Sequence, residues 1–195
     1  MAIPAVVEGY MEAVFLPLVL KQIGRSDLQP IIRIAGGGQN FWVIAERYNE
    51  AGKRSSVLGL ADLEETQCAP LLLARKLPYK SPGFHLRIAV RMLESWLLAD
   101  RQSMAKFLKV RISALPTNPD CESHAKRLLV DIARKSTSKT IRTALVPDGS
   151  GAVVGPDYVA TMNKFIEQDW RVSVARMTSP SLEKACQRWT AIKNT

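Results

Sequence analysis

The stretch AVVEGYMEAVFLPLVLKQI, residues 5–23, sets the pattern from which the fold follows. It opens with a short apolar run, which Glu8 and Gly9 interrupt. Apolar residues then return at positions 11, 14, 15 and 18, a spacing that places them on one face of a helix. Pro17 falls inside this helix and predicts a kink. The stretch is therefore typical of a strand, a glycine turn and a helix.

The same alternation of strand and helix continues to residue 99. Further strands are expected at residues 30–35, 56–60 and 85–90. Helices are expected at residues 10–23, 40–50, 67–76 and 93–99, with Asn40 as a helix cap. This rhythm predicts an α/β fold with a mostly parallel, Rossmann-like sheet flanked by helices.

The second half of the chain is mainly helical. Its helices are expected at residues 103–108, 124–135, 157–169 and 181–192, separated by stretches rich in proline and glycine. We interpret residues 1–110 as an α/β core and residues 111–195 as a mainly helical C-terminal extension packed on it.

Charge is divided unevenly along the 195 residues. The net charge is +9, but residues 1–70 carry 6 Lys/Arg and 8 Asp/Glu, whereas residues 71–195 carry 21 and 10. The basic excess indicates an anionic partner, with nucleic acid first and an anionic membrane surface second. The alternative is that the basic groups are solvated helix faces. These groups are Arg87 and Arg91, Lys106 to Arg111, Lys126 and Arg127, Arg134 and Lys135, and Lys139 to Arg142.

Several classes of protein are excluded or disfavoured by composition. The chain has no uncharged apolar run of about 18 residues that would span a membrane. Glu8 and Glu12 make the apolar N-terminus a poor secretory signal. Three cysteines without metal-ligand spacing favour neither a disulfide framework nor a zinc site, and they fit a cytoplasmic setting. The phosphate-binding loop of many ATPases is also missing from the sequence.

Acidic residues follow three of the expected strands. Glu8 and Glu12 follow the first, Asp62 and Glu64 the third, and Glu94 the fourth, with Asp100 further on. Ligand sites of α/β proteins lie at these carboxyl ends. If residues 62–64 are extended, Asp62 and Glu64 point the same way. Such carboxylates suit a hard cation such as Mg²⁺. The alternative is that they only cap helices.

Other residues carry weaker signals. Gly36, Gly37 and Gly38 could present backbone N–H groups to a phosphate, or could form an ordinary turn. His85 and His124 lack the partners of a catalytic triad. The tryptophans lie in apolar helical contexts, where core packing is favoured over base stacking. They are Trp42, Trp96, Trp170 and Trp189.

Several ordered motifs resemble the Toprim fold, the metal-binding module of topoisomerases, bacterial primases and OLD-type nucleases. They are V-E-G-x-x-E at residues 7–12 and L-A-D-L-E at residues 60–64. R-I-A-V-R-M-L-E-S-W-L-L-A-D at residues 87–100, V-G-P-D-Y at 154–158 and S-P-S-L at 179–182 resemble a bacterial Toprim-like family of unknown function. Members of that family are often encoded beside ATPases in neighbourhoods associated with phage defence.

The resemblance implies a role for each acid. Glu8 matches the general acid/base or metal ligand, and Glu12 the second acid of the first motif. Asp62 and Glu64 match the paired aspartates, with Glu64 in place of the usual second aspartate. Glu94 is a marker acid of the family and an accessory candidate. Apart from the resemblance, the basic residues offer Lys126 as a further accessory candidate, since Lys126 or Lys139 could lie near the acidic edge.

These observations predict a Mg²⁺- or Mn²⁺-dependent nuclease or phosphodiesterase acting on nucleic acid, with an ATPase as a further partner. The alternative is a non-catalytic module that binds nucleic acid or an ATPase. Nucleotidyl transfer, as in primases, is a weaker third hypothesis because no further motif supports it.

Overall fold

The computed structural model describes residues 1–149 and 151–193, so residues 150, 194 and 195 of the expected C-terminal extension lie outside the described residues. Four parallel strands form one sheet in the order β2-β1-β3-β4. The α/β prediction and its parallel sheet are thus confirmed. The strands are β1 (Ala2–Val7), β2 (Gln29–Ile34), β3 (Val57–Asp62) and β4 (Phe84–Ala89).

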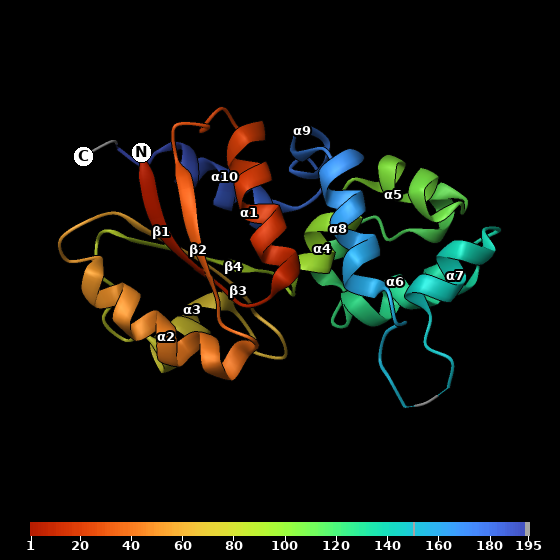
Figure 1. Cartoon of the computed structure of the whole chain (residues 1–195), viewed down its shortest axis with the longest axis horizontal. Helices are drawn as coiled ribbons and strands as arrows, with labels where there is room; N and C mark the ends of the chain where they lie inside the picture. The colour runs from red at the N-terminus through yellow and green to blue at the C-terminus, as the bar shows by residue number, and fades with distance from the viewer. Residues whose placement is uncertain (150, 194–195) are drawn as a thin grey trace.

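Helices cover both faces of the sheet (Figure 1). α1 (Tyr10–Gln22) and α10 (Pro180–Thr190) lie on one face, whereas α2 (Gly38–Ala51) and α3 (Ala69–Lys76) lie on the other. Alternate residues of β1 supply both layers, because Val6 packs against α2 while Ala5 and Val7 pack against α1. The sheet is therefore buried on both sides, as parallel sheets require.

The remaining helices form a group beside the sheet, at the right of Figure 1. They are α4 (Leu93–Leu98), α5 (Arg101–Leu108), α6 (Ala125–Arg134), α7 (Lys139–Leu145), α8 (Tyr158–Gln168) and α9 (Val172–Ala175), with short 3₁₀ turns at Ile112–Ala114 and Pro119–Cys121. α8 packs along α1, and α10 returns to β4.

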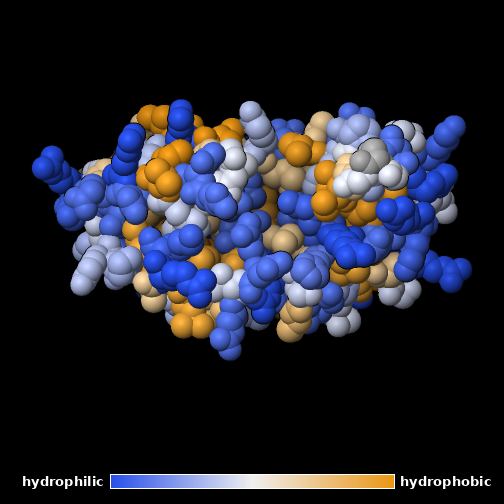
Figure 2. All heavy atoms as spheres, turned by 90° about the horizontal axis from the view of Figure 1, so that it is seen from below, coloured by the Kyte–Doolittle hydropathy of each residue, from blue (hydrophilic) through white to orange (hydrophobic). Residues whose placement is uncertain are grey.

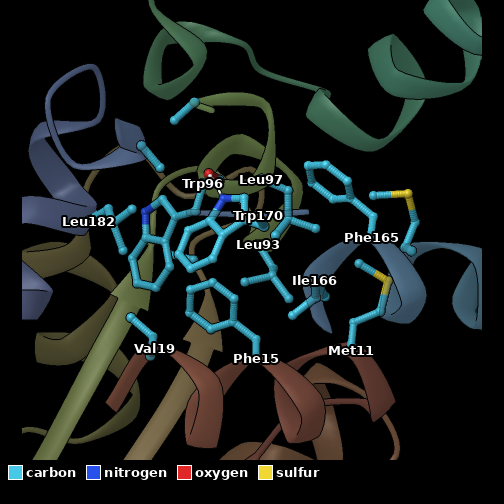
Figure 3. Packing of buried hydrophobic residues seen from close by; sticks show 14 of the residues in the cluster. Met11, Phe15, Val19, Leu93, Trp96, Leu97, Phe165, Ile166, Trp170 and Leu182 are labelled. Carbon is cyan, nitrogen blue, oxygen red and sulfur yellow. Dashed lines mark hydrogen bonds between the residues drawn. The ribbon is translucent and has the colours of Figure 1, made fainter. Parts of the chain in front are cut away.

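One apolar cluster joins this helical group to the sheet. Phe15 of α1 lies 5.7 Å from Trp96 and 4.9 Å from Trp170, measured between ring centroids (Figure 3). Trp96 in turn lies 6.2 Å from Trp189 of α10. Trp42 of α2 is also buried, in a second apolar cluster on the face of the sheet that α2 covers. The interpretation of the four tryptophans as core residues is confirmed.

Polar contacts also connect distant parts of the chain that meet around this apolar cluster. Asp100, which is fully buried, accepts hydrogen bonds from the backbone N–H, Nε and Nη2 of Arg171 at 2.9–3.1 Å. Gln22 of α1 donates to the carbonyl of Trp170 and accepts from the N–H of Val172. Residues more than 70 positions apart are therefore held together by paired donors and acceptors.

The outer surface is dominated by hydrophilic residues. Seen from below, on the side of α2 and α3, apolar residues appear in small separate groups (Figure 2). Within the described part of the chain, no helix combines the length and the apolar character that crossing a membrane requires.

Candidate functional site

The acids gather where the chain changes direction between neighbouring strands. β1 connects through α1 to β2 on one side, and the chain then crosses to β3 on the other. Glu8 directly follows β1, and Asp62 is the last residue of β3. Their positions therefore lie at the topological switch point, the edge at which open α/β sheets bind ligands.

Glu8 is tied to both adjoining segments. Its Oε2 accepts a hydrogen bond from the N–H of Asp62 at 3.2 Å. Its backbone carbonyl accepts from the N–H groups of Gly36 and Gly37 at 3.0 and 3.1 Å. Both glycines have positive φ, 79° and 120°, which side-chain-bearing residues rarely adopt. These two amides hold the end of β1, so the structure gives them a partner other than the phosphate considered for them.

Gly38 has a different task, since it is the first residue of α2. A Cβ placed on it would lie 3.3 Å from Glu8 Oε1 and 3.4 Å from Glu64 Oε1. The missing side chain therefore lets the N-terminus of a 14-residue helix approach two carboxylates. The positive end of the helix dipole favours negative charge there. The expected cap at Asn40 is wrong, because α2 begins two residues earlier and Gly37 occupies the cap position.

Asp62 joins β3 to the helix that follows β4. Its Oδ1 accepts a hydrogen bond from the N–H of Leu93 at 2.9 Å. Leu93 is the first residue of α4, so the carboxylate lies at an amino-terminal helix end. β3 is longer than expected, and Asp62 lies within it rather than beyond it.

Glu12 and Glu94 complete the acidic group from the first turns of α1 and α4. Glu12 is 8% exposed and Glu94 is 2% exposed. Glu94 Oε1 accepts a hydrogen bond from the Tyr158 hydroxyl at 3.0 Å and lies 3.6 Å from Lys126 Nζ. Burial of two carboxyls so close together is costly unless a cation or donors compensate.

These side chains line one pocket of about 290 Å³. Its lining includes Glu8, Glu12, Asp62, Glu94 and Lys126, which come from five different segments of the chain. We call it the acidic pocket. Three of the four acids proposed as catalytic or metal-binding thus meet there, together with both accessory candidates.

Glu64 is placed differently. The extended segment expected at residues 62–64 ends at Asp62, and Glu64 adopts a positive φ of 52° in the following turn. The condition under which Asp62 and Glu64 were expected to point the same way is therefore not met, because the two-residue period applies only within a strand. Glu64 lies beside Glu8 at Gly38, outside the lining of the acidic pocket.

Burial and mutual repulsion make the carboxyls of the acidic pocket hard to ionise. Burial, together with the charges of Glu94 and Glu8, raises the pKa of Glu12 to about 7. Burial also raises the pKa of Asp62 well above its usual range, with added effects of Glu12 and Glu94. The pocket is thus short of positive charge.

The same imbalance acts on Glu8, on Lys126 and on Tyr158, which contacts Glu94 from outside the pocket lining. Burial raises the pKa of Glu8, and the charge of Glu64 contributes in the same direction. The charge of Glu94 raises the pKa of Lys126, and burial raises that of the Tyr158 hydroxyl well above its usual range. Lys126 is therefore a firmly protonated cation that compensates part of the acidic charge.

The donor set fits a hard divalent cation by its chemistry. Mg²⁺ and Mn²⁺ are bound by carboxylate oxygens, and added positive charge would offset both the burial and the repulsion that raise the pKa values of Glu8, Glu12 and Asp62. In residues 1–149 and 151–193, the side chains as they stand bring no three Asp, Glu, His or Cys groups into an arrangement ready to hold a metal ion. The present geometry is that of an acid cluster compensated by lysine.

Sequence reasoning missed Tyr158 as a residue of this site. Its only signal was its place in the V-G-P-D-Y motif, at the start of α8. Asp100, grouped with Glu94 in the sequence, does not line the acidic pocket. Its hydrogen bonds with Arg171 lower the pKa of its carboxyl. His85 lies near Ser56 Oγ at 3.3 Å and takes no part in the acidic pocket.

Searches against models of protein families, curated proteins and solved structures give no match for this chain. The class that fold and site define is therefore an α/β protein with an acidic pocket at the switch point of a parallel sheet. The Toprim-like resemblance stays a prediction.

The raised pKa of Glu12 predicts that the metal-free protein loses stability as pH rises. Its carboxyl binds a proton more tightly when folded, with a pKa of about 7, than at the ordinary value of 4.5. Below both pKa values the Glu12 carboxyl does not lower the free energy of unfolding. Above both values it lowers that free energy by about 3 kcal/mol. Roughly 2 kcal/mol of this falls between about pH 5.5 and pH 8.

Urea unfolding in EDTA at these two pH values measures the effect. Glu12→Gln should flatten the pH dependence relative to the wild type. Glu167→Gln, which changes an exposed acid on α8, should leave it unchanged. A wild-type protein that is more stable at the higher pH would contradict this assignment of charge.

Proposed function

We propose that the protein is a Mg²⁺- or Mn²⁺-dependent phosphodiesterase that acts on nucleic acid. The observation that carries this proposal is the meeting of Glu8, Glu12, Asp62 and Glu94 with Lys126 at the carboxyl ends of β1 and β3. Carboxylates clustered beside a lysine suit phosphoryl chemistry, which needs a bound cation and charge stabilisation at the phosphate.

Each residue has a role set by its position. Glu8, Glu12 and Asp62 would hold the ion, which supplies charge neutralisation at the phosphate and a more acidic bound water. Glu8, whose pKa is raised, is placed to take or return a proton. Lys126, the cation of the pocket, would meet a phosphate oxygen, while the Tyr158 hydroxyl fixes Glu94.

The basic half of the chain supports nucleic acid as the substrate. Lys109, Arg111 and Lys135 line one surface hollow, and Arg134 and Arg142 line another, both on the helical group beside the sheet. Lysine and arginine side chains on such a surface neutralise the phosphates of a nucleic acid backbone without reading its sequence. The resemblance adds an ATPase partner and a cytoplasmic role in phage defence to the proposal, and the three free cysteines fit a reducing compartment.

A non-catalytic module is the second candidate function. It is favoured by Lys126, because an ammonium group that already compensates the acids can take the place of a metal ion in a purely structural cluster. The position of Glu64 outside the pocket lining also favours this second candidate, because one of the expected metal ligands is then missing. In this case the protein would bind nucleic acid or an ATPase without cleaving anything.

Calorimetric titration with Mn²⁺, followed by a cleavage assay, separates the two functions. The phosphodiesterase should bind Mn²⁺ more tightly at about pH 8 than at about pH 5.5, because protons compete for the same carboxyls. The substrates are end-labelled DNA and RNA of one sequence, each in single- and double-stranded form. The phosphodiesterase should cleave at least one of them, and EDTA should stop the reaction. Heat of Mn²⁺ binding without cleavage would favour the non-catalytic module, and so would the absence of both heat and cleavage.

A further inference from the structure

A second pocket, of about 510 Å³, opens at the outer edge of the sheet along β4. It lies between α3, the turn after β3 and the N-terminal end of α10. Its volume is in the range of small-molecule sites. We call it the basic pocket, because Lys80, Arg87, Arg91 and Lys184 line it with a single acid, Asp120.

Asp120 offsets only one of these four positive charges, and its carboxylate is held at the N-terminal end of α10. It accepts hydrogen bonds from Ser179 Oγ at 2.6 Å and from the N–H of Ser181 at 2.9 Å. The cations contact neutral groups instead. Arg91 Nη1 donates to the carbonyl of Thr66 at 2.7 Å, and Lys80 Nζ donates to that of Phe84 at 2.9 Å. Among the ion pairs of the described residues, none includes any of the four.

Arg87 adds an unmet hydrogen bond. Its Nε is buried and has no hydrogen-bond partner among the described residues. A buried donor left unpaired opposes folding, and a hydrogen bond to an anionic ligand would offset that cost. Burial and the charge of Arg188 lower the pKa of Arg87, and burial with Arg87 lowers that of Lys80. These cations therefore repel one another in a partly dry site.

The rest of the lining is apolar with polar points. Leu73, Leu86 and Ile88 offer an aliphatic surface, while Gln67 and Ser181 offer hydrogen-bonding groups. An alkyl chain would leave the polar groups unpaired. A nucleobase has flat apolar faces, an edge of donors and acceptors, and affinity for guanidinium planes.

We propose that the basic pocket binds a nucleoside phosphate, with the phosphate held by Arg87 and Lys184 and the base lying against the aliphatic surface. This goes beyond the proposed function, because it requires neither a divalent ion nor cleavage. The pocket is separate from the acidic pocket, although Asp62 lines one and the next residue, Leu63, lines the other.

The test is calorimetric titration of the full chain in EDTA at low salt. Adenosine 5′-monophosphate should bind one to one, and adenosine and inorganic phosphate should each bind at least tenfold more weakly. Hexathymidylate distinguishes the source of the ligand. Tighter binding than the mononucleotide assigns the pocket to a nucleic acid strand, and equal or weaker binding assigns it to free nucleotides.

Lys184→Gln should weaken binding of the mononucleotide about tenfold, as expected for one charge-assisted hydrogen bond. The matched control is Lys164→Gln, the same change at an exposed position on α8, which should leave affinity unchanged. Asp62→Asn should also bind normally, so that failure of this proposal is distinct from failure of the metal site. Equal effects of the two lysine changes would overturn the proposal. Binding of dodecyl phosphate but not of the mononucleotide would do the same.

Discussion

Asp62→Asn should lower metal-dependent cleavage by about 10²–10³-fold while the protein remains folded. Asp62 ends β3, and its backbone N–H and its carboxylate connect Glu8 to the start of α4, so it is the acid that joins the two sides of the pocket. Asparagine has the same shape. It keeps an oxygen for the N–H of Leu93 and leaves the backbone N–H that binds Glu8 unchanged. What it removes is the negative charge.

The stability of this variant provides an independent check. The pKa of Asp62 is raised well above its usual range by burial and neighbouring acids, so its ionised form opposes folding. At about pH 8 without metal, Asp62→Asn should be at least as stable as the wild type. Mn²⁺ should stabilise it less, because one ligand has lost its charge.

Glu64→Gln is the matched control for the cleavage assay. It removes one carboxylate two residues further along the chain, in the turn after β3, from a side chain outside the pocket lining. Its cleavage rate should fall less than tenfold. Equal losses in the two variants, or full activity in Asp62→Asn, would show that the acidic pocket is not where the reaction occurs.

Trp96→Ala should lower the free energy of unfolding by about 4 kcal/mol. The side chain is fully buried, packing against Phe15 of α1 (Figure 3) and against Trp189 of α10. Its Nε1 donates to Ser181 Oγ at 2.7 Å. Alanine would leave a cavity at the junction of the sheet and the helical group, and it would remove this hydrogen bond.

Urea unfolding followed by far-ultraviolet circular dichroism measures the loss. Tyr79→Ala, which truncates an aromatic residue that is 88% exposed, should change stability by less than about 0.5 kcal/mol. Both variants should unfold in one transition, since a single apolar cluster spans α1, α4, α8 and α10. Two separate transitions in the wild type, or a small loss in Trp96→Ala, would contradict this account of the core.

The strand and helix pattern could be predicted from the sequence because it depends on local periodicity. Apolar runs marked all four strands to within three residues at either end. α7 was missed because Lys139–Leu145 is short and has little apolar periodicity, and its start depends on a Ser138 side chain that accepts from the N–H of Ile141. Helices of this length are stabilised by tertiary packing rather than by propensity.

The acidic site was predictable only in part, for a related reason. Glu8, Glu12 and Asp62 follow strands that lie side by side, so topology brings them together. The position of Glu64 depended on where β3 ends, which local patterns resolve poorly. Tyr158 contacts Glu94 across 64 positions in the sequence, and nothing in the spacing of the chain specifies such a contact.

The return of α10 to β4 also bears on how the protein is made. Tyr158 of α8 contacts Glu94 of the acidic pocket, and Ser181 and Lys184 of α10 complete the basic pocket. On a ribosome, the four strands emerge well before these residues do, with Phe15 and Trp96 still lacking their later partners. Both pockets therefore assemble late, and a nascent chain carries its acids and cations for some time before either set is arranged to act.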